Sequence, residues 1–277
     1  MGVRQIDEAE VAQLVDVLQK LGSNIAPSQD AAWTNPVAVK IIDCVLSLNR
    51  PYDRFVVPRL ELFKTKHPQI ITAAQLAEAM AAYSDANAFV EQELNYKHVE
   101  RAVILDKVVQ FVCQITSTHA GEDEELILQQ WAKSAPPDGY KSLKIRGFAI
   151  AGFQYLRMLF GASTTKPDVH IIGFVTECIG RKVNEIESLR LLEEASARAG
   201  VSLLDVDTTI WELRARGESV VAEKSETPVG PSKHTSTMTK EQAITLLKQV
   251  LAEAPLSDQA KDDINRVIID MAASPSC

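Results

Sequence analysis

The sequence predicts an all-α protein, and three observations lead to this fold class. Apolar residues recur at helical spacing along nearly the whole chain, and no stretch alternates between apolar and polar residues as a half-buried strand does. Segments that contain proline or glycine separate the periodic stretches. With 277 residues, of which 46% are hydrophobic, the chain is long enough to bury a full core.

The expected helices follow one another with short breaks. The first covers about residues 7–21, with an apolar stripe through Val11, Leu14 and Leu18. The second begins at Asn35-Pro36, a capping residue followed by a proline at the first helical position, and continues to Asn49. The remaining helices of the core are expected at about residues 55–66 (with Pro58 early), 72–82, 85–95, 98–118, from the acidic segment 119–125 to the breaker at 136–139, 149–160, 169–180, 184–199 and 203–215.

The composition changes after residue 216. Residues 217–238 are rich in Ser, Thr, Pro, Gly and charged residues, which cannot bury enough apolar surface to fold alone, so they are expected to form a flexible linker. Residues 239–277 again show helical periodicity and predict a two-helix tail. This tail has two interpretations, because it can dock on the 1–216 core or bind a protein partner.

The four cysteines argue against a metal centre. Cys44, Cys113, Cys178 and Cys277 are far apart and form no Cys-x-x-Cys pair, which excludes the usual structural zinc and iron–sulfur patterns. Free thiols within apolar helices fit a reducing cytosol. The acidic amino terminus lacks the apolar centre of a signal peptide, and no apolar stretch has the length of a membrane span, so we expect a soluble, cytoplasmic protein.

The charge is unevenly distributed. The net charge of −8 is unfavourable for binding an anion, but the stretch from Lys141 to Lys182 carries seven cations and only two carboxylates, Asp168 and Glu177. Such a basic stretch in an acidic protein is either the footprint of one anionic ligand or a solvated helix face.

A short hairpin at residues 145–149 has the features of a phosphate site. Gly147 permits a left-handed backbone or the close approach of another chain. Small residues at Ala149, Ala151 and Gly152 leave the first turn of the next helix open, and the free amides there attract an anion. Lys144 and Arg146 add positive charge on either side of Ile145. The segment therefore predicts a grip on phosphate that reads no base.

Ile145-Arg146-Gly147-Phe148-Ala149 resembles the "hydrophobic-x-Gly-hydrophobic-Gly" hairpin of the helix-hairpin-helix (HhH-GPD) base-excision DNA glycosylase superfamily, which includes endonuclease III. In that family an aspartate in a "Val-Asp-Thr-His"-like turn follows about two dozen residues later, and Lys166-Pro167-Asp168-Val169-His170 has the matching place. Leu46-Ser47-Leu48-Asn49 resembles the family's "Leu-Ser-x-Gln" corner. The resemblance spans about residues 36–214.

The resemblance implies a two-lobed helical HhH-GPD fold with DNA between the lobes. One lobe would comprise about residues 50–165, and the other would join the amino-terminal helices to residues 166–216. The chain would then be a base-excision repair N-glycosylase that extrudes a damaged, modified or mismatched base from double-stranded DNA, located with the nucleoid in a prokaryote or in the nucleus of a eukaryote.

The site residues that the resemblance implies fall into three groups. Asp168 would be the catalytic carboxylate, since a carboxylate beside the sugar stabilises the positive charge that builds up as the base departs, or deprotonates the attacking water. The gap left by the base would be filled from the corner at Asn49, Arg50 and Tyr52. The DNA-binding residues would be Lys144, Arg146, Gly147, Phe148, Ala149, Ala151, Gly152 and His170.

Departures from the family pattern limit what it implies. The second hairpin glycine is Ala149, which loosens or tilts the phosphate grip. Bifunctional members carry a nucleophilic lysine just after the hairpin, where this chain has Ala151 and Gly152, so we expect a monofunctional enzyme without lyase activity. The family's carboxy-terminal cysteine cluster is absent, so no cofactor is expected, although a monovalent cation at the hairpin fits the resemblance.

Each candidate residue also has a structural interpretation. Asp168 follows proline and precedes an apolar helix, as a helix N-cap does. Asn49 is a common helix terminator, and Lys166 is an alternative amine nucleophile. His170 can equally be a packed or capping residue, and Tyr52 and Trp33 can be ordinary core or surface residues.

Two other function classes fit the sequence. One is a catalytically silent HhH DNA-binding or scaffold protein whose carboxy-terminal helices recruit a partner. The other is a helical protein-interaction module without DNA, which suits the net charge of −8. Salt-dependent binding to duplex DNA distinguishes the DNA-binding classes from the last.

Overall fold

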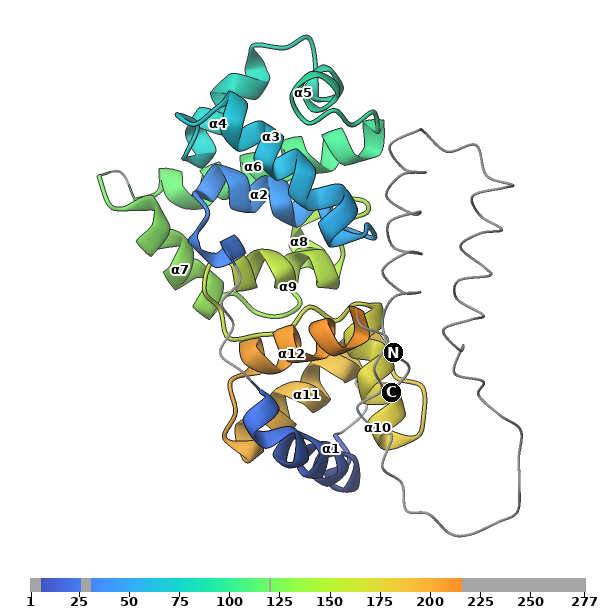
Figure 1. Cartoon of the computed structure of the whole chain (residues 1–277). Helices are drawn as coiled ribbons and strands as arrows, with labels where there is room; N and C mark the ends of the chain where they lie inside the picture. Colours follow the sequence, from blue (N-terminus) through green and yellow to red (C-terminus); the bar gives the residue numbers. More distant parts are fainter. Residues whose placement is uncertain (1–5, 26–30, 120, 216–277) are drawn as a thin grey trace, which may run out of the picture. The chain divides into compact units, whose positions relative to one another are not determined.

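The computed structural model describes residues 6–25, 31–119 and 121–215 of the chain, and Figure 1 shows their arrangement. Within these ranges every regular element is a helix, so the predicted all-α class is confirmed. No helix among them is both long enough and apolar enough to cross a membrane. The predicted linker at 217–238 and the two-helix tail at 239–277 lie outside the described residues.

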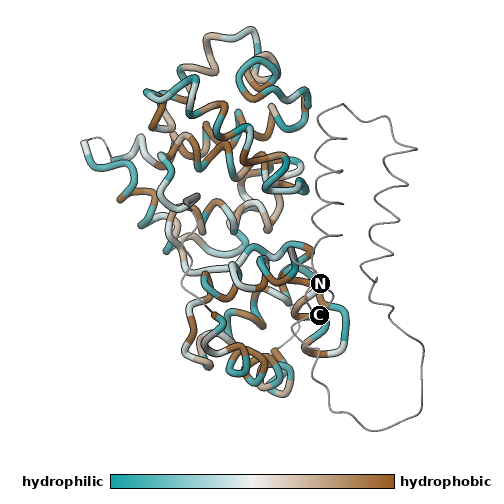
Figure 2. Tube along the Cα trace, in the orientation of Figure 1, coloured by the Kyte–Doolittle hydropathy of each residue, from teal (hydrophilic) through white to brown (hydrophobic). Residues whose placement is uncertain are grey.

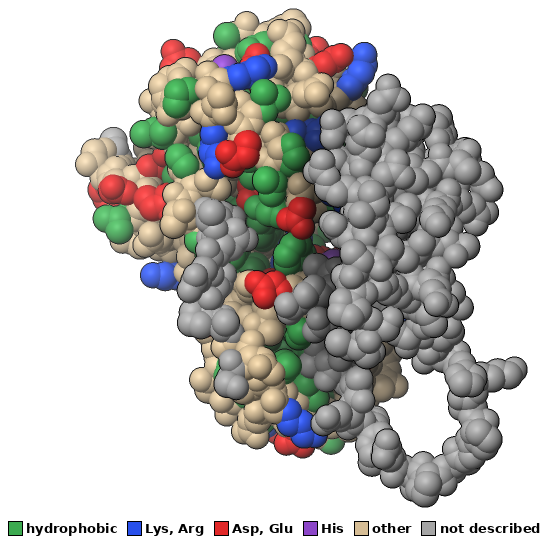
Figure 3. All heavy atoms as spheres, in the orientation of Figure 1, with side chains coloured by type: hydrophobic (Ala, Val, Ile, Leu, Met, Phe, Trp, Pro, Cys, Tyr) green, Lys and Arg blue, Asp and Glu red, His purple; other side chains and the backbone are tan. Residues whose placement is uncertain are grey.

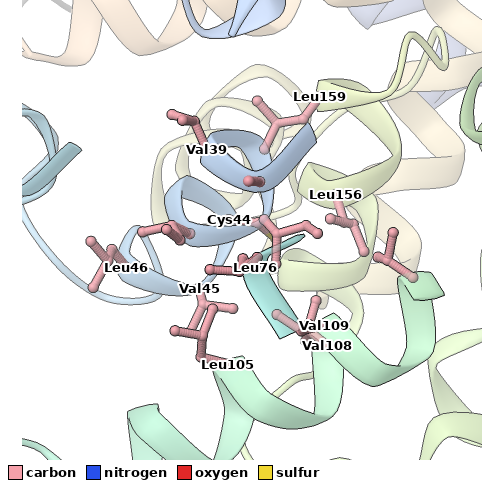
Figure 4. Packing of buried hydrophobic residues seen from close by; sticks show 14 of the residues in the cluster. Val39, Cys44, Val45, Leu46, Leu76, Leu105, Val108, Val109, Leu156 and Leu159 are labelled. Carbon is pink, nitrogen blue, oxygen red and sulfur yellow. The ribbon is translucent and has the colours of Figure 1, made fainter. Parts of the chain in front are cut away.

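The larger of two hydrophobic clusters is built around α2 (Val37–Leu46). Every residue of α2 is buried, because helices pack against it from several sides. Figure 4 shows side chains of α2 packed against those of α6 and α9, with Val45 beside Leu105. The other helices of this cluster are η3 (Tyr52–Val56), α3 (Val57–Lys66), α4 (Ala73–Ala81), α5 (Ala86–Glu93), α6 (Val99–Ser117), α7 (Glu124–Ser134), α8 (Tyr140–Leu143) and α9 (Ile150–Leu159).

The smaller cluster joins the first helix of the chain to the last described ones. It contains α1 (Glu8–Leu21), α10 (Val169–Ile179), α11 (Glu185–Ala199) and α12 (Leu203–Ala215). Figure 2 shows apolar stretches concentrated within each group of helices. The lobes predicted from the sequence differ from these clusters at α2, which packs with α6 and α9 rather than with α1.

Side-chain caps explain why most helices begin near the predicted residues. Asp7, Thr72 and Asp123 accept hydrogen bonds from amides in the first turns of α1, α4 and α7. The expected cap at Asn35 is wrong, because Pro36 occupies the cap position of α2 with an extended backbone and no side chain caps that helix. The short elements η1 (Gly22–Asn24) and η2 (Ala31–Thr34) lie between α1 and α2.

Two other boundaries differ from the prediction. The helix α2 ends at Leu46 rather than at Asn49. The helix expected from Phe55 is preceded by the π-helical turn η3, and α3 starts at Val57, with Pro58 in its first turn, where a proline breaks no helical hydrogen bond.

The buried charged side chains of α2 have ion-pair or hydrogen-bond partners on neighbouring helices. The Lys40 ammonium forms an ion pair with Glu125 of α7. The Asp43 carboxylate accepts hydrogen bonds from the hydroxyl of Tyr52 at 2.8 Å and from that of Tyr155 at 3.3 Å. Because a buried charge without partners is strongly destabilising, these contacts fix α2 relative to η3, α7 and α9.

Candidate nucleic-acid interface

The hairpin between α8 and α9 has the backbone that its glycine predicts. Gly147 has a φ of +84°, in the region that glycine tolerates best. A Cβ atom at this position would lie 2.9 Å from Cδ1 of Ile104 on α6, so a larger residue would have to displace the end of that side chain as well as adopt the positive φ. The Phe148 amide donates to the Ile145 carbonyl at 3.1 Å and closes the turn.

The hairpin side chains divide between the core and the surface. Ile145 and Phe148 are buried, whereas Lys144, Arg146 and Ala149 are exposed. The ring of Phe148 is therefore an anchor for the turn, and the expected contact of this residue with DNA is restricted to its backbone. Within the described ranges, neither Lys144 nor Arg146 forms an ion pair, so both cations are available to a ligand.

A shallow hollow of about 340 Å³ lies over the hairpin. Lys144, whose own backbone is left-handed, and Arg146 contribute its charged rim. The hollow is lined by Tyr140, Lys141, Lys144, Ile145, Arg146, Gly147, Phe148 and Ala149.

The first turn of α9 opens towards this hollow only in part. Ala149 is the N-cap and supplies no side-chain hydrogen bond, so no side chain of the described residues caps the first amides of α9. Gly152, by contrast, is buried, and a Cβ there would lie 2.8 Å from Leu48 and 2.9 Å from Phe148. The expectation that Gly152 keeps the turn open for DNA is therefore wrong, because its small size serves packing against the corner after α2.

The basic stretch from Lys141 to Lys182 is not one surface. The Arg157 guanidinium is buried and donates to the Ala132 carbonyl at 2.9 Å, and burial lowers its pKa. Arg181 forms an ion pair with Glu10 of α1. On the face shown in Figure 3, blue cations and red carboxylates are interspersed. Among the described residues of this stretch, the part around Lys144 and Arg146 still presents exposed positive charge, as the sequence predicts.

Asp168 caps α10. Its Oδ1 accepts hydrogen bonds from the amides of His170 at 2.9 Å and Ile171 at 3.4 Å, so the capping interpretation is confirmed. Its Oδ2 lies 3.9 Å from Nζ of Lys166, and 23% of the side chain is exposed. The cap uses one oxygen, and the side chain as a whole stays partly exposed, so capping and chemistry are compatible.

Lys166 connects Asp168 to α9. Its Nζ lies 4.5 Å from the centre of the Tyr155 ring, a cation–π geometry. Tyr155 is held in turn by its hydrogen bond to Asp43 of α2. Tyr155 stands five residues after Ile150, which corresponds to about 8 Å along the helix axis. The Lys166 side chain thus links Asp168 to Tyr155 of α9, the helix that begins at the hairpin.

Asp207 of α12 was not among the residues predicted from the sequence. One of its carboxylate oxygens accepts hydrogen bonds from the hydroxyl of Thr165 and from the amide of Lys166, the latter at 2.9 Å. Burial raises the pKa of Asp207 to about 7, against the opposing effect of these hydrogen bonds. The aspartate fixes the loop that leads to Asp168.

The corner after α2 carries the residues predicted to fill the gap of an extruded base. Asn49 is exposed and has a φ of +53°, which asparagine tolerates better than most residues. Arg50 is exposed and donates to the Tyr96 hydroxyl at 3.2 Å. Tyr52 has structural partners, since it binds Asp43 and its ring lies edge-on to Trp211 at 6.2 Å.

The corner and the hairpin are in contact through the packing of Leu48 against Gly152. The structure therefore brings Asn49, the Gly147 hairpin and α9 together, and Lys166 adds Asp168 to this group. Trp33 is only partly buried and packs against the larger cluster. Among the residues that the structure describes, no group of three or more His, Cys, Asp or Glu side chains is arranged to hold a metal ion.

Comparison with known proteins gives a family but no activity. No curated protein and no solved structure matches the chain. A family model described as "Domain of unknown function (DUF8548)" matches residues 11–215, which include nearly all of α1 and every later described helix. The hairpin, the Asp168 loop and the corner at Asn49 all lie within the match. The chain therefore belongs to the DUF8548 family.

Proposed function

We propose that the protein is a monofunctional DNA N-glycosylase, which hydrolyses the bond between deoxyribose and a damaged, modified or mismatched base. The observation that carries the proposal is the path from Asp168 through Lys166 and Tyr155 to α9, the helix that starts at the Gly147 hairpin. A strand gripped at the hairpin would present a neighbouring sugar to the carboxylate.

The hairpin supplies the grip on the DNA backbone. The uncapped amides at the start of α9 attract a phosphate, and the exposed Lys144 and Arg146 add positive charge at the rim of the hollow. Contacts of this kind hold the strand but read no sequence, as an enzyme that acts on damage at any site requires. Extrusion of the base costs a few kcal/mol, which such contacts offset.

Asp168 supplies the chemistry. Loss of the base leaves positive charge at the anomeric carbon, and the Oδ2 atom, which the cap does not use, is suited to stabilise this charge or to accept a proton from water. The two amide hydrogen bonds to Oδ1 fix the direction of the carboxylate. A carboxylate that is already oriented needs no reorganisation during the reaction.

A lyase step is not part of the proposal. Bifunctional HhH-GPD glycosylases carry a lysine nucleophile just after the hairpin. In this chain Ala151 and Gly152 occupy that position, and Gly152 is buried against Leu48. Lys166, the alternative amine, contacts the Tyr155 ring and lies near Asp168. We therefore expect strand breaks only after the abasic product is heated in alkali.

The test uses duplexes that each carry one lesion or mismatch, followed by alkali and separation of the strands. The wild-type protein should release the base from at least one duplex, and Asp168→Asn should reduce the rate of release at least about 100-fold while duplex binding persists. Asp123→Asn is a matched control, because Asp123 is also an N-cap and asparagine caps equally well. Equal rates for wild type and Asp168→Asn would refute the catalytic role.

The engagement of Asp168 also favours a second candidate function. With Oδ1 in the cap and Oδ2 near Lys166, the carboxylate has structural partners on both sides, as in a DNA-binding relative without catalysis. Duplex binding without release of any base from the panel would assign the protein to this class.

A further inference from the structure

Three arginines from different elements converge beside the corner at Asn49. Arg50 follows the corner, Arg59 lies on α3 and Arg101 on α6, and their common neighbour is Tyr96. Arg50 donates to the Tyr96 hydroxyl at 3.2 Å, and the Arg59 guanidinium lies 5.5 Å from the centre of its ring. Arg101 is close enough to both Tyr96 and Arg50 for each to affect its pKa.

None of the three arginines forms an ion pair within the described part of the chain. Neutral groups hold them instead. Arg59 donates to the carbonyl of Phe55 at 2.9 Å and stacks on the ring of that residue at 3.8 Å, and Arg101 donates to the carbonyl of Leu48. The Nε atoms of Arg59 and Arg101 are buried and have no hydrogen-bond partner among the described residues.

This arrangement is unusual for an acidic protein. The chain has 37 Asp and Glu residues against 29 Lys and Arg, so carboxylates are not scarce. Arg181, Arg198 and Arg214 each form an ion pair with a glutamate, as surface arginines commonly do. Guanidinium groups that are held together without a counter-charge repel one another, and an anion bound among them relieves that repulsion.

Burial lowers the pKa of two of these guanidinium groups. It lowers the pKa of Arg59 and that of Arg101, and the charge of Arg50 also lowers the pKa of Arg101, against the opposing effects of Tyr96 and Glu100. Both guanidinium groups stay charged at neutral pH. The cluster therefore presents positive charge that no ion pair within the described residues neutralises, carried by α3, α6 and the corner after α2.

The position of the cluster indicates its ligand. Arg50 is adjacent to Asn49, and Arg101 binds the carbonyl of Leu48, the residue that packs against the first turn of α9. We infer that Arg50, Arg59 and Arg101 form a second binding site for the phosphodiester backbone of duplex DNA, beside the Asn49 corner. This inference rests on the proposed DNA binding and adds a site that the hairpin motif does not contain.

The test measures binding of an undamaged 20-base-pair duplex between 50 and 300 mM sodium chloride by fluorescence anisotropy. Each phosphate contact contributes about 0.9 to the slope of log K against log salt. Arg59→Gln and Arg50→Gln should each lower the slope by about 1 and weaken binding about fivefold to tenfold at low salt. Arg198→Gln is the matched control, because it removes the same charge from a guanidinium that glutamates already neutralise.

The variant Tyr96→Phe tests the arrangement of the three arginines separately from their charge. It keeps all three arginines and removes the hydroxyl to which Arg50 donates, so binding should weaken about twofold to fivefold with net charge unchanged. Arg50 is exposed, so its variant folds even if substitution at the partly buried Arg59 impairs folding, which circular dichroism would reveal.

The outcomes distinguish this inference from the proposed function. If Arg50→Gln and Arg59→Gln bind like Arg198→Gln while the wild-type protein releases a base, the inference fails and the proposed function stands. If the arginine variants bind more weakly but no base is released, the second phosphate site stands and catalysis fails. If the wild-type protein does not bind duplex DNA, both are overturned.

Discussion

The carboxyl group of Asp207 couples the stability of the fold to pH. Its pKa is raised to about 7 by burial, above the ordinary value of 3.8 that it regains on unfolding. A raised pKa means that the folded state prefers the neutral acid, so its contribution is fully present below pH 4 and is lost as pH rises through about 7. We predict that Asp207→Asn removes this loss, on the order of 2–4 kcal/mol in the free energy of unfolding between pH 4 and 8.

Urea unfolding of both proteins across this pH range measures the effect. The amide oxygen introduced by Asp207→Asn can still accept the hydrogen bonds from Thr165 and Lys166, whereas Asp207→Ala removes the acceptor and should be about 1–3 kcal/mol less stable than Asp207→Asn at every pH. Parallel pH profiles for the wild-type protein and Asp207→Asn would contradict the assignment.

At Gly147, a single added Cβ atom is expected to lower the stability of the fold. Gly147→Ala places a Cβ atom 2.9 Å from Ile104 and forces alanine to adopt a φ of +84°. Gly180→Ala is the control, because Gly180 has a φ of +75° but no atom within 4 Å of the added Cβ. We expect a loss of about 1 kcal/mol for Gly180→Ala and about 2–3 kcal/mol for Gly147→Ala in urea unfolding. Equal losses would mean that Ile104 yields to the extra carbon.

The sequence predicted the individual site residues unevenly. The capping role of Asp168 follows from its own neighbours, proline before it and an apolar helix after it, and the structure confirms it. Asp207 and Arg101 could not be found this way, since their partners Lys166 and Leu48 lie about 40 and 50 residues away in the chain. Phe148 shows that a residue within a motif can be an anchor rather than a contact.

At the scale of elements, a network around Glu93 joins the end of α3 to the end of α5. The Glu93 carboxylate accepts hydrogen bonds from the hydroxyl of Tyr83 at 2.7 Å and pairs with Nε2 of His67 at 2.7 Å and with Lys66 at 3.4 Å. Burial acts to raise the pKa of Glu93, but these hydrogen bonds and the charge of Lys66 outweigh it and lower the pKa. The network therefore stabilises the fold only while Glu93 is ionised.

Glu93→Gln should reduce the free energy of unfolding by about 1–2 kcal/mol at pH 7. The difference from the wild-type protein should shrink as pH falls below the ordinary glutamate value of 4.5, since a lowered pKa contributes above that value and is lost as acid protonates the carboxylate. Glu91→Gln on the same helix is the control, because Glu91 is exposed and forms only a surface pair with Lys97. A pH-independent effect at Glu93 would contradict the role of its charge.

The elements themselves were largely predictable, because helix caps and periodicity act locally. The ranges expected for α4, α5 and α6 agree with the structure within two residues at each end. The short helix α8 was missed, since four residues after a proline-rich breaker carry no periodic signal. The π-helical turn η3 was missed for a similar reason, as its geometry depends on the contact of Tyr52 with Asp43 of α2.

At the scale of the whole described unit, the proposed site takes the hairpin from the larger cluster and Asp168 from the start of α10, a helix of the smaller one. A duplex with a cationic pyrrolidine in place of one sugar imitates the charge of the transition state, and a neutral tetrahydrofuran ring is the control. We predict that the wild-type protein prefers the cationic duplex at least about tenfold and that Asp168→Asn abolishes this preference.

Lys144→Ala should weaken binding of both duplexes equally, because a contact to the phosphate backbone does not depend on charge in the sugar. The free-energy effects of Lys144→Ala and Asp168→Asn should then add. If Lys144→Ala alone abolished the preference for the cationic duplex, phosphate binding and charge stabilisation would not be separate roles of the two clusters.

The arrangement of two hydrophobic clusters was predictable in outline from the order of the helices, but the place of α2 was not. Both clusters present apolar faces, and periodicity does not tell which partner a wholly apolar helix will join. The deciding contacts are specific and distant in sequence, such as the pairing of Lys40 with Glu125 and the hydrogen bond from Tyr155 to Asp43.

The absence of a side chain at Gly152 has a mechanical consequence. A methyl group of Leu48 fills the space that any larger residue there would take, so the turn before Asn49 is seated directly on the opening turn of α9. Two segments more than 90 residues apart in the chain are thus packed directly against each other. If the proposed function is correct, a duplex held at both segments would be bent by the same contact that positions the corner to fill the vacated space, so the two events would be coupled.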